Sequence, residues 1–93
     1  MSTPVEDAAL LQRFLRQHRG GWRVTGREVM RSYELTAERE VQPGRLFRIA
    51  PRYDPEKIAR LAARRRWYFA YLAEQIERQY QQAERVLPKV ETN

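Results

Sequence analysis

Apolar side chains near the N-terminus recur at helical spacing, with Leu11 and Leu15 on one face. The four residues 3–6, Thr-Pro-Val-Glu, form a capping box with proline at the first helical position. Gly20 and Gly21 end the pattern, because glycine readily takes the conformation that closes a helix. The sequence therefore predicts an amphipathic core helix that starts near residue 4 and runs to about His18.

The next stretch of the chain predicts a second, shorter helix. Trp22, Arg23 and Val24 alternate in polarity and are compatible with an extended segment. Residues 25–28, Thr-Gly-Arg-Glu, then form another capping box, with an unfavourable glycine inside the first turn. A short helix over residues 26–32, placed after a longer helix and a glycine-bearing turn, has the order of a helix-turn-helix unit.

Residues 34–50 allow two interpretations. In the first, Thr36 caps a short helix that would be the second helix of a helix-turn-helix. In the second, residues 35–41 alternate in polarity as a strand does, and the chain turns at Pro43-Gly44. We favour the helix or a loop, followed by an extended segment, so that a small β-hairpin at 41–50 would form the wing of a winged-helix-like unit.

The longest uninterrupted pattern covers residues 54–87. Asp54 is a good N-cap, Pro55 fits the first helical position, and Pro88 stops the helix. At 1.5 Å per residue, a helix of roughly 32 residues is about 48 Å long. The expected fold is therefore mainly α and a single domain. It comprises a helix-turn-helix or winged-helix-like unit over 1–53, the long helix over 54–87 and a tail over 88–93.

One side of the expected long helix carries an apolar seam at a seven-residue repeat. Its members are Ile58, Ala62, Arg65, Phe69, Leu72, Ile76, Gln79, Ala83 and Val86. A short N-terminal unit cannot reach along the whole seam, so we expect its first half to pack within the chain. Residues 76–86 would then pair two copies of the chain. The predicted partner interface is Phe69, Leu72, Ile76, Gln79, Ala83 and Val86.

Positive charge is concentrated in one window of the chain. The formal net charge is +6, from 18 Lys and Arg against 12 Asp and Glu. Residues 45–66 alone carry a net charge of +6, whereas the segments on either side nearly balance. A localised basic patch is the electrostatic footprint of a polyanion binder. The alternative is that the arginines only solvate a surface.

Cations and aromatic rings share a stripe on the face of the helix opposite the seam. Lys57, Arg60, Arg64, Trp67 and Tyr71 follow one another at spacings of three and four residues. Such a stripe can neutralise phosphates and then stack on a base or sugar. The alternative, which we favour for Trp67 taken alone, is that the aromatic rings fill the core and the arginines are their solvated neighbours.

The predicted nucleic-acid contacts extend this stripe to other basic positions. They are Arg27, Arg31, Arg45, Arg48, Arg52, Lys57, Arg60, Arg64, Arg66 and Trp67. Within this set, Arg27 and Arg31 lie on the expected short helix and would read base edges. The other basic residues would bind the phosphate backbone, and Trp67 would stack on a base or sugar.

Several classes of function find no support in the residues. The chain has no cysteine and a single histidine, so we expect no disulfide and no metal or other cofactor. No apolar run approaches the length of a membrane span, and the N-terminus lacks a secretion signal, so we expect a cytoplasmic protein. There is no glycine-rich phosphate cradle and no nucleophile elbow, so we expect no enzyme.

The expected function is binding to nucleic acid without chemistry. The favoured form is a dimeric DNA-binding regulator, with duplex DNA as the partner and RNA as a variant. The rival is a protein-interaction adaptor, inhibitor or assembly subunit that docks an acidic partner through its long helix.

Overall fold

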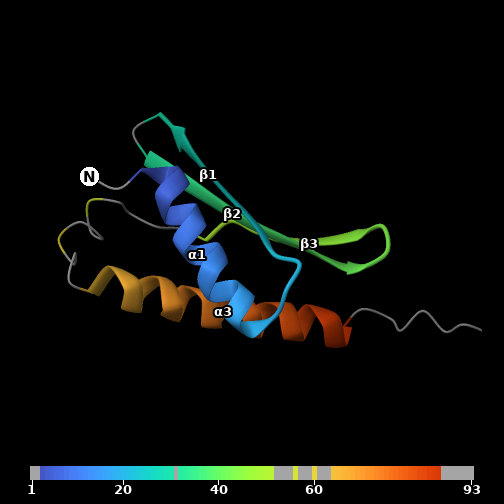
Figure 1. Cartoon of the computed structure of the whole chain (residues 1–93). Helices are drawn as coiled ribbons and strands as arrows, with labels where there is room; N and C mark the ends of the chain where they lie inside the picture. Colours follow the sequence, from blue (N-terminus) through green and yellow to red (C-terminus); the bar gives the residue numbers. More distant parts are fainter. Residues whose placement is uncertain (1–2, 31, 52–55, 57–59, 61–63, 87–93) are drawn as a thin grey trace, which may run out of the picture.

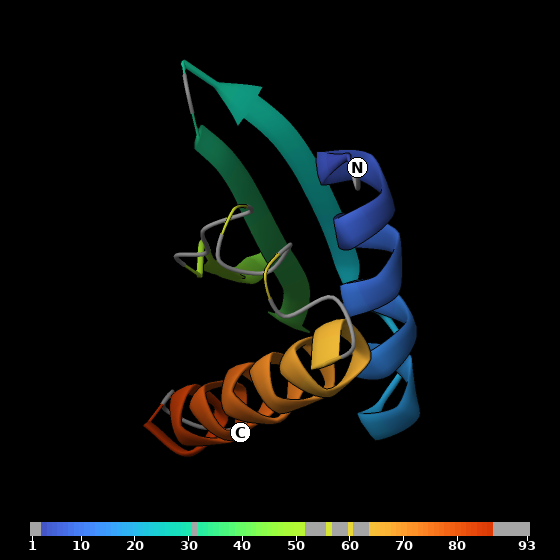
Figure 2. The same ribbon diagram turned by 90° about the vertical axis from the view of Figure 1, so that its left-hand side faces the viewer.

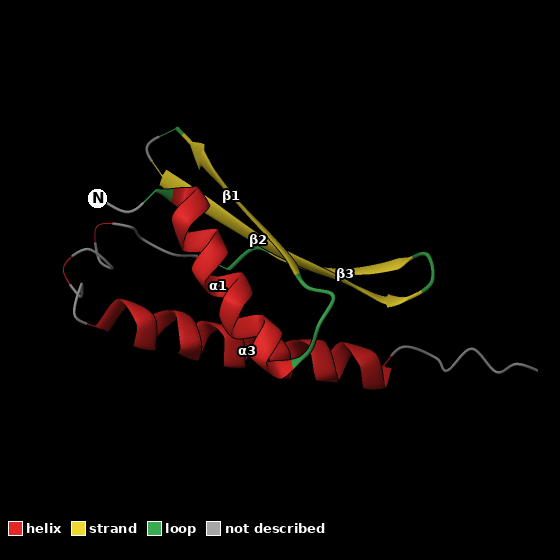
Figure 3. Cartoon of the chain, viewed as in Figure 1, coloured by secondary structure: helices red, strands yellow, loops and turns green. Residues whose placement is uncertain are grey.

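The computed structural model describes residues 3–30, 32–51, 56, 60 and 64–86. Within them the element order is α1 (Pro4–His18), β1 (Arg23–Val29), β2 (Ser32–Gln42), β3 (Arg45–Ile49) and α3 (Arg65–Val86). The strands form an antiparallel sheet in the order β1-β2-β3, next to the two helices (Figures 1 and 3). The predicted mainly α fold, a helix-turn-helix followed by one long helix, is wrong.

Helix α1 has the bounds that its capping box predicts. The Thr3 hydroxyl accepts a hydrogen bond of 3.2 Å from the Glu6 amide, and Pro4 occupies the first helical position. Leu11 and Leu15 are completely buried on its inner face. This element needs no tertiary information to be predicted, because its cap, apolar stripe and stop agree with one another.

Strand β1 replaces the short helix predicted over residues 26–32. Val24 and Gly26 are less exposed than Arg23, Thr25 and Arg27, so the burial alternates over residues 23–27, as the two-residue period of a strand requires. The capping box at 25–28 is therefore a chance match. Gly26 has a packing role instead: a Cβ built there would lie 2.2 Å from the backbone oxygen of Pro4. The glycine lets the first turn of α1 approach the strand.

Strand β2 shows that the less favoured interpretation of residues 35–41 is the correct one. Leu35 and Ala37 are fully buried on its inner face, and residues 36–40 are neither helix nor loop. The chain turns at Pro43-Gly44, where Gly44 has φ of 82°, and returns as β3. The predicted return strand is confirmed, but it pairs with a long β2 and does not form the wing of a helical unit.

Both helices pack on the same face of the sheet. Helix α1 lies against β1 and β2, and α3 lies against α1 and β3, as the two orthogonal views show (Figures 1 and 2). One cluster of buried side chains joins all five elements. The opposite face of the sheet presents alternating charged and polar residues, among them Thr25, Arg27 and Arg48.

Helix α3 begins at Arg65, so the prediction of one helix from Asp54 is wrong. Of the predicted N-terminal part, residues 54, 55, 57–59 and 61–63 lie outside the described residues. The buried face of α3 also departs from the predicted seam. It consists of Phe69, Ala73, Ile76, Glu77 and Tyr80. A straight helix keeps its 3.6-residue period, whereas a seven-residue repeat drifts by about 20° per heptad, so Tyr80 faces the core in place of Gln79.

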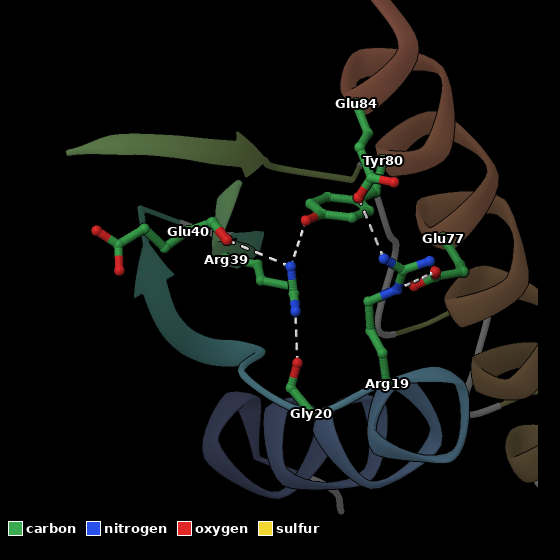
Figure 4. Close-up of polar contacts among 7 residues, drawn as sticks. All are labelled: Arg19, Gly20, Arg39, Glu40, Glu77, Tyr80 and Glu84. Atoms are coloured by element: carbon green, nitrogen blue, oxygen red, sulfur yellow. Dashed lines mark hydrogen bonds and ion pairs between the residues drawn. The ribbon is translucent and has the colours of Figure 1, made fainter. Parts of the chain in front are cut away.

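Tyr80 anchors α3 to the rest of the molecule. Its ring makes edge contacts with Trp22 and Phe47, at centroid separations of 5.4 and 5.5 Å. The guanidinium groups of Arg19 and Arg39 lie 4.7 and 5.0 Å from its ring centroid. Figure 4 shows the ring with these two arginines, which reach it from the end of α1 and from β2.

Polar contacts around Tyr80 also hold together the end of α1, strand β2 and helix α3. Arg39 donates to the Tyr80 hydroxyl and, at 2.8 Å, to the carbonyl oxygen of Gly20 (Figure 4). Arg19 pairs with the buried carboxylate of Glu77 at 2.5 Å and with Glu84 at 3.4 Å. These two arginines are therefore structural, and their charge is turned toward the core.

Candidate nucleic-acid interface

Two aromatic rings lie on the solvent-facing side of α3. Trp67 and Tyr71 are one helical turn apart, and their rings stack with centroids 5.7 Å apart and planes 11° apart. Their exposed fractions are 66% and 49%, whereas Trp22, the other tryptophan, is buried. Phe69 and Ala73 face the core, and the helical period turns Trp67 and Tyr71 outward. The interpretation of Trp67 as a core residue is wrong.

Several arginines precede this aromatic pair in the sequence. Arg64 immediately precedes α3 and Arg66 lies in its first turn, and both side chains are exposed. Arg60 is exposed as well. None of the three side chains forms a hydrogen bond or ion pair with another described residue. Their charges are therefore available to a partner.

The position of these cations is electrostatically unfavourable for the isolated chain. The first turn of α3 contains no acidic residue. The N-terminal end of a helix carries a partial positive charge, so arginines near it are repelled and an anion would be attracted. A negatively charged partner at Arg64 and Arg66 would relieve that repulsion.

Arg65 differs from its two neighbours because it points inward. It donates two hydrogen bonds, of 2.5 and 3.2 Å, to one carboxylate oxygen of Asp7, which is completely buried in α1. Its guanidinium also lies 5.7 Å from the ring centroid of Phe69. The run of three arginines thus divides into one structural cation and two exposed ones.

The aromatic run that follows divides in the same way. Trp67 is exposed, Phe69 is buried, and Tyr68 between them is half-buried with its ring edge-on to Phe69, at 5.4 Å between centroids. Burial raises the pKa of the Tyr68 phenol above its ordinary value. Tyr68 therefore stays neutral at physiological pH and joins the apolar side of the helix.

Two of the predicted contacts lie elsewhere and are already paired. Arg27 bridges to Glu34 at 3.0 Å and Arg48 to Glu38 at 3.0 Å, both across neighbouring strands of the open sheet face. Their charge is neutralised there. Arg27 also lies on a strand, so the expected reading of base edges from a short helix is wrong.

The remaining predicted contacts do not add to the same surface among the described residues. Arg45 is exposed at the start of β3, next to the β2–β3 turn, which lies at the far right of Figure 1, whereas α3 starts at the left. Arg31, Arg52 and Lys57 lie outside the described residues. The set that the structure brings together is Arg64, Arg66 and Trp67. Tyr71 belongs to the same surface, although it is not among the predicted contacts. Its spacing of four residues from Trp67 is what indicates in the sequence that the two side chains share a face.

The residues of the predicted partner interface differ in how far the chain itself buries them. Phe69 and Ile76 are covered by the chain's own core, and Leu72 is half-buried against it. Gln79 is exposed, Ala83 is half-buried, and Val86 ends α3. The short unit expected to leave this seam uncovered is in fact a sheet and a helix, which cover much of it within one chain.

The open face of the sheet offers no comparable site among the described residues. An open hollow on the sheet is lined by Thr25, Arg27, Glu34, Thr36, Glu38, Arg48 and Ala50, but its two arginines are bound by its own carboxylates. Within the described ranges, no three His, Asp or Glu residues are grouped so that they could hold a metal ion. No helix in that part of the chain is long and apolar enough to cross a membrane.

Comparison of the chain with protein-family models, with curated proteins and with solved structures found no match. No relative therefore contributes a function, a partner or a set of site residues.

Proposed function

We propose that this chain is a small nucleic-acid-binding protein that acts by binding and not by chemistry. Arg64 and Arg66 would contact phosphates at the start of α3, and Arg60, which precedes them in the chain, would add a further phosphate contact. Trp67 with Tyr71 would contact bases or sugars. The observation that supports this most strongly is the exposed aromatic pair beside exposed arginines that lack a described partner.

The combination of side chains favours a nucleic acid over a simple anion. Arginine presents a planar fork of donors that matches two phosphate oxygens at once. Exposed tryptophan and tyrosine add flat apolar surface, on which the π-face of any base can stack. A small anion would use the arginines and leave Trp67 and Tyr71 without a contact.

The binding geometry differs from a helix-turn-helix. Residues 26–29 belong to β1 and residues 32–40 to β2, so the described residues of this stretch form no recognition helix. The proposed contacts instead lie where α3 begins. The affinity would therefore come from phosphate contacts and from stacking, and neither depends strongly on the base sequence of the nucleic acid.

A charge reversal at the proposed phosphate contacts tests this function. The double variant Arg64→Glu/Arg66→Glu should lose at least about tenfold in affinity for an oligonucleotide, because each lost phosphate contact removes favourable counterion release. Fluorescence anisotropy of a labelled oligonucleotide at low salt measures this.

The matched control is Arg13→Glu/Arg16→Glu, which changes the net charge equally at exposed positions of α1. It should retain most of the affinity. If both double variants weaken binding equally, only the overall charge matters and no local site exists. If the unaltered chain binds no nucleic acid at low salt, the proposed function is wrong.

A further inference from the structure

The Trp67 indole is held in a fixed orientation with much of its surface open. Tyr71 stacks almost parallel to it, 11° between ring planes, and so covers part of one face. With 66% of Trp67 exposed, the outward surface remains free. A helix side chain braced by its neighbour one turn later is a pre-ordered platform, and ordering it costs little when a ligand arrives.

We infer that the ligand of this platform is an unpaired, single-stranded segment of nucleic acid, with a base stacked on Trp67. This inference rests on the proposed function and names its substrate class. In a duplex the faces of the bases are covered by their neighbours, and a protein meets only base edges and phosphates. A free base face is available only where the strand is unpaired.

The arginines are compatible with a single strand running past the platform. Arg64 and Arg66 precede and adjoin Trp67 in the chain, so phosphate contacts and base stacking occur at one end of α3. A backbone that follows these cations presents its bases successively to the aromatic pair. Positive charge next to stacking aromatics is the usual arrangement in proteins that bind single strands.

The site is short because the cationic character ends within a turn of Tyr71. Glu74 follows it on the exposed side of α3 and is paired with Arg78 at 2.8 Å. Because Glu74 and Arg78 neutralise each other, neither adds an attraction for a phosphate. The platform therefore accommodates one or two bases and makes no continuous groove.

The decisive experiment compares a single strand with a duplex. Affinities are measured by anisotropy for a labelled oligothymidylate of roughly 12 nucleotides and for a duplex of the same length, at the same salt. The unaltered chain should bind the single strand more tightly. Trp67→Ala/Tyr71→Ala should weaken oligothymidylate binding by about 30-fold and duplex binding by less than about threefold, because only the single strand can stack.

Two control variants separate stacking from other effects. Leu46→Ala removes an exposed apolar side chain from β3, away from the platform, and should leave both affinities unchanged. Trp67→Phe/Tyr71→Phe keeps two aromatic rings and should retain most of the single-strand preference. Because Trp67 and Tyr71 are exposed, thermal unfolding of the alanine variant should match that of the unaltered chain.

The outcomes distinguish this inference from the proposed function. Equal affinity for single strand and duplex, unchanged in the alanine variant, overturns the single-strand inference and leaves nucleic-acid binding intact. Absence of binding to both probes overturns both. In that second case, saturable binding of polyglutamate that is lost in the alanine variant would identify the site as a dock for an acidic protein.

Discussion

Arg65 and Arg66 are neighbours in the sequence and serve different purposes in the molecule. Arg65 points to the buried carboxylate of Asp7 and ties the start of α3 to α1. Arg66 is exposed and has no partner among the described residues. The angular positions of a helix already indicate this division, because the two residues differ by about 100° around its axis.

Substitution of these two arginines should separate stability from binding. Arg65→Gln removes a charge that compensates a buried carboxylate and should lower the free energy of unfolding by roughly 2–3 kcal/mol. Arg66→Gln should leave stability within about 0.5 kcal/mol and weaken oligonucleotide binding. Urea unfolding and anisotropy measure the two quantities. Equal destabilisation by both substitutions would contradict the inward position of Arg65.

The exposure of Trp67 could not be predicted from its residue type. Tryptophan is apolar and buried in most proteins, which favours a place in the core. Its environment here is decided by which side of α3 meets α1 and the sheet, and that depends on Phe69, Ile76 and Tyr80 together. Spacing showed that Trp67 and Tyr71 share a face but not that this face meets water.

At the scale of elements, the predictions succeed where the pattern is local and fail where it depends on tertiary contacts. Helix α1 is fully specified by its cap and stripe. Strand β2 is hard to predict from the sequence because Arg39 lies on its inner face, where the alternating pattern of a strand predicts an apolar residue. Its guanidinium is accommodated there by Tyr80 and the Gly20 carbonyl, which the sequence does not place beside it.

The close packing of α1 on β1 predicts that a side chain at Gly26 would destabilise the fold. Gly26→Ala should lower the free energy of unfolding by about 1–3 kcal/mol, because the added Cβ would lie 2.2 Å from a backbone oxygen and force the elements apart. Thermal or urea unfolding measures the change.

Gly20→Ala is the matched control, because a Cβ at Gly20 meets no atom within 4 Å. It should change the free energy of unfolding by less than about 1 kcal/mol. If Gly26→Ala is as well tolerated as Gly20→Ala, α1 does not approach β1 as closely as the structure indicates.

At the scale of the whole molecule, fewer of the 18 basic side chains are free to bind a partner than the sequence suggests. Among the described residues, Arg19, Arg27, Arg48 and Arg65 are engaged by carboxylates, and Arg39 is held against Tyr80. Folding therefore turns a basic window into a smaller cationic and aromatic surface at the start of α3. A polyanion would respond to the unpaired cations of this surface more than to the net charge of the whole chain.

Titration of the unaltered chain with oligothymidylate, followed by tryptophan emission, tests the nucleic-acid interface most directly. Trp22 is buried and Trp67 is exposed, so a base that stacks on the platform should quench Trp67. We predict saturable quenching that weakens with salt, with a slope of log affinity against log salt near −2 for about three phosphate contacts. Absence of quenching and of binding at the lowest salt would contradict a nucleic-acid interface at the start of α3.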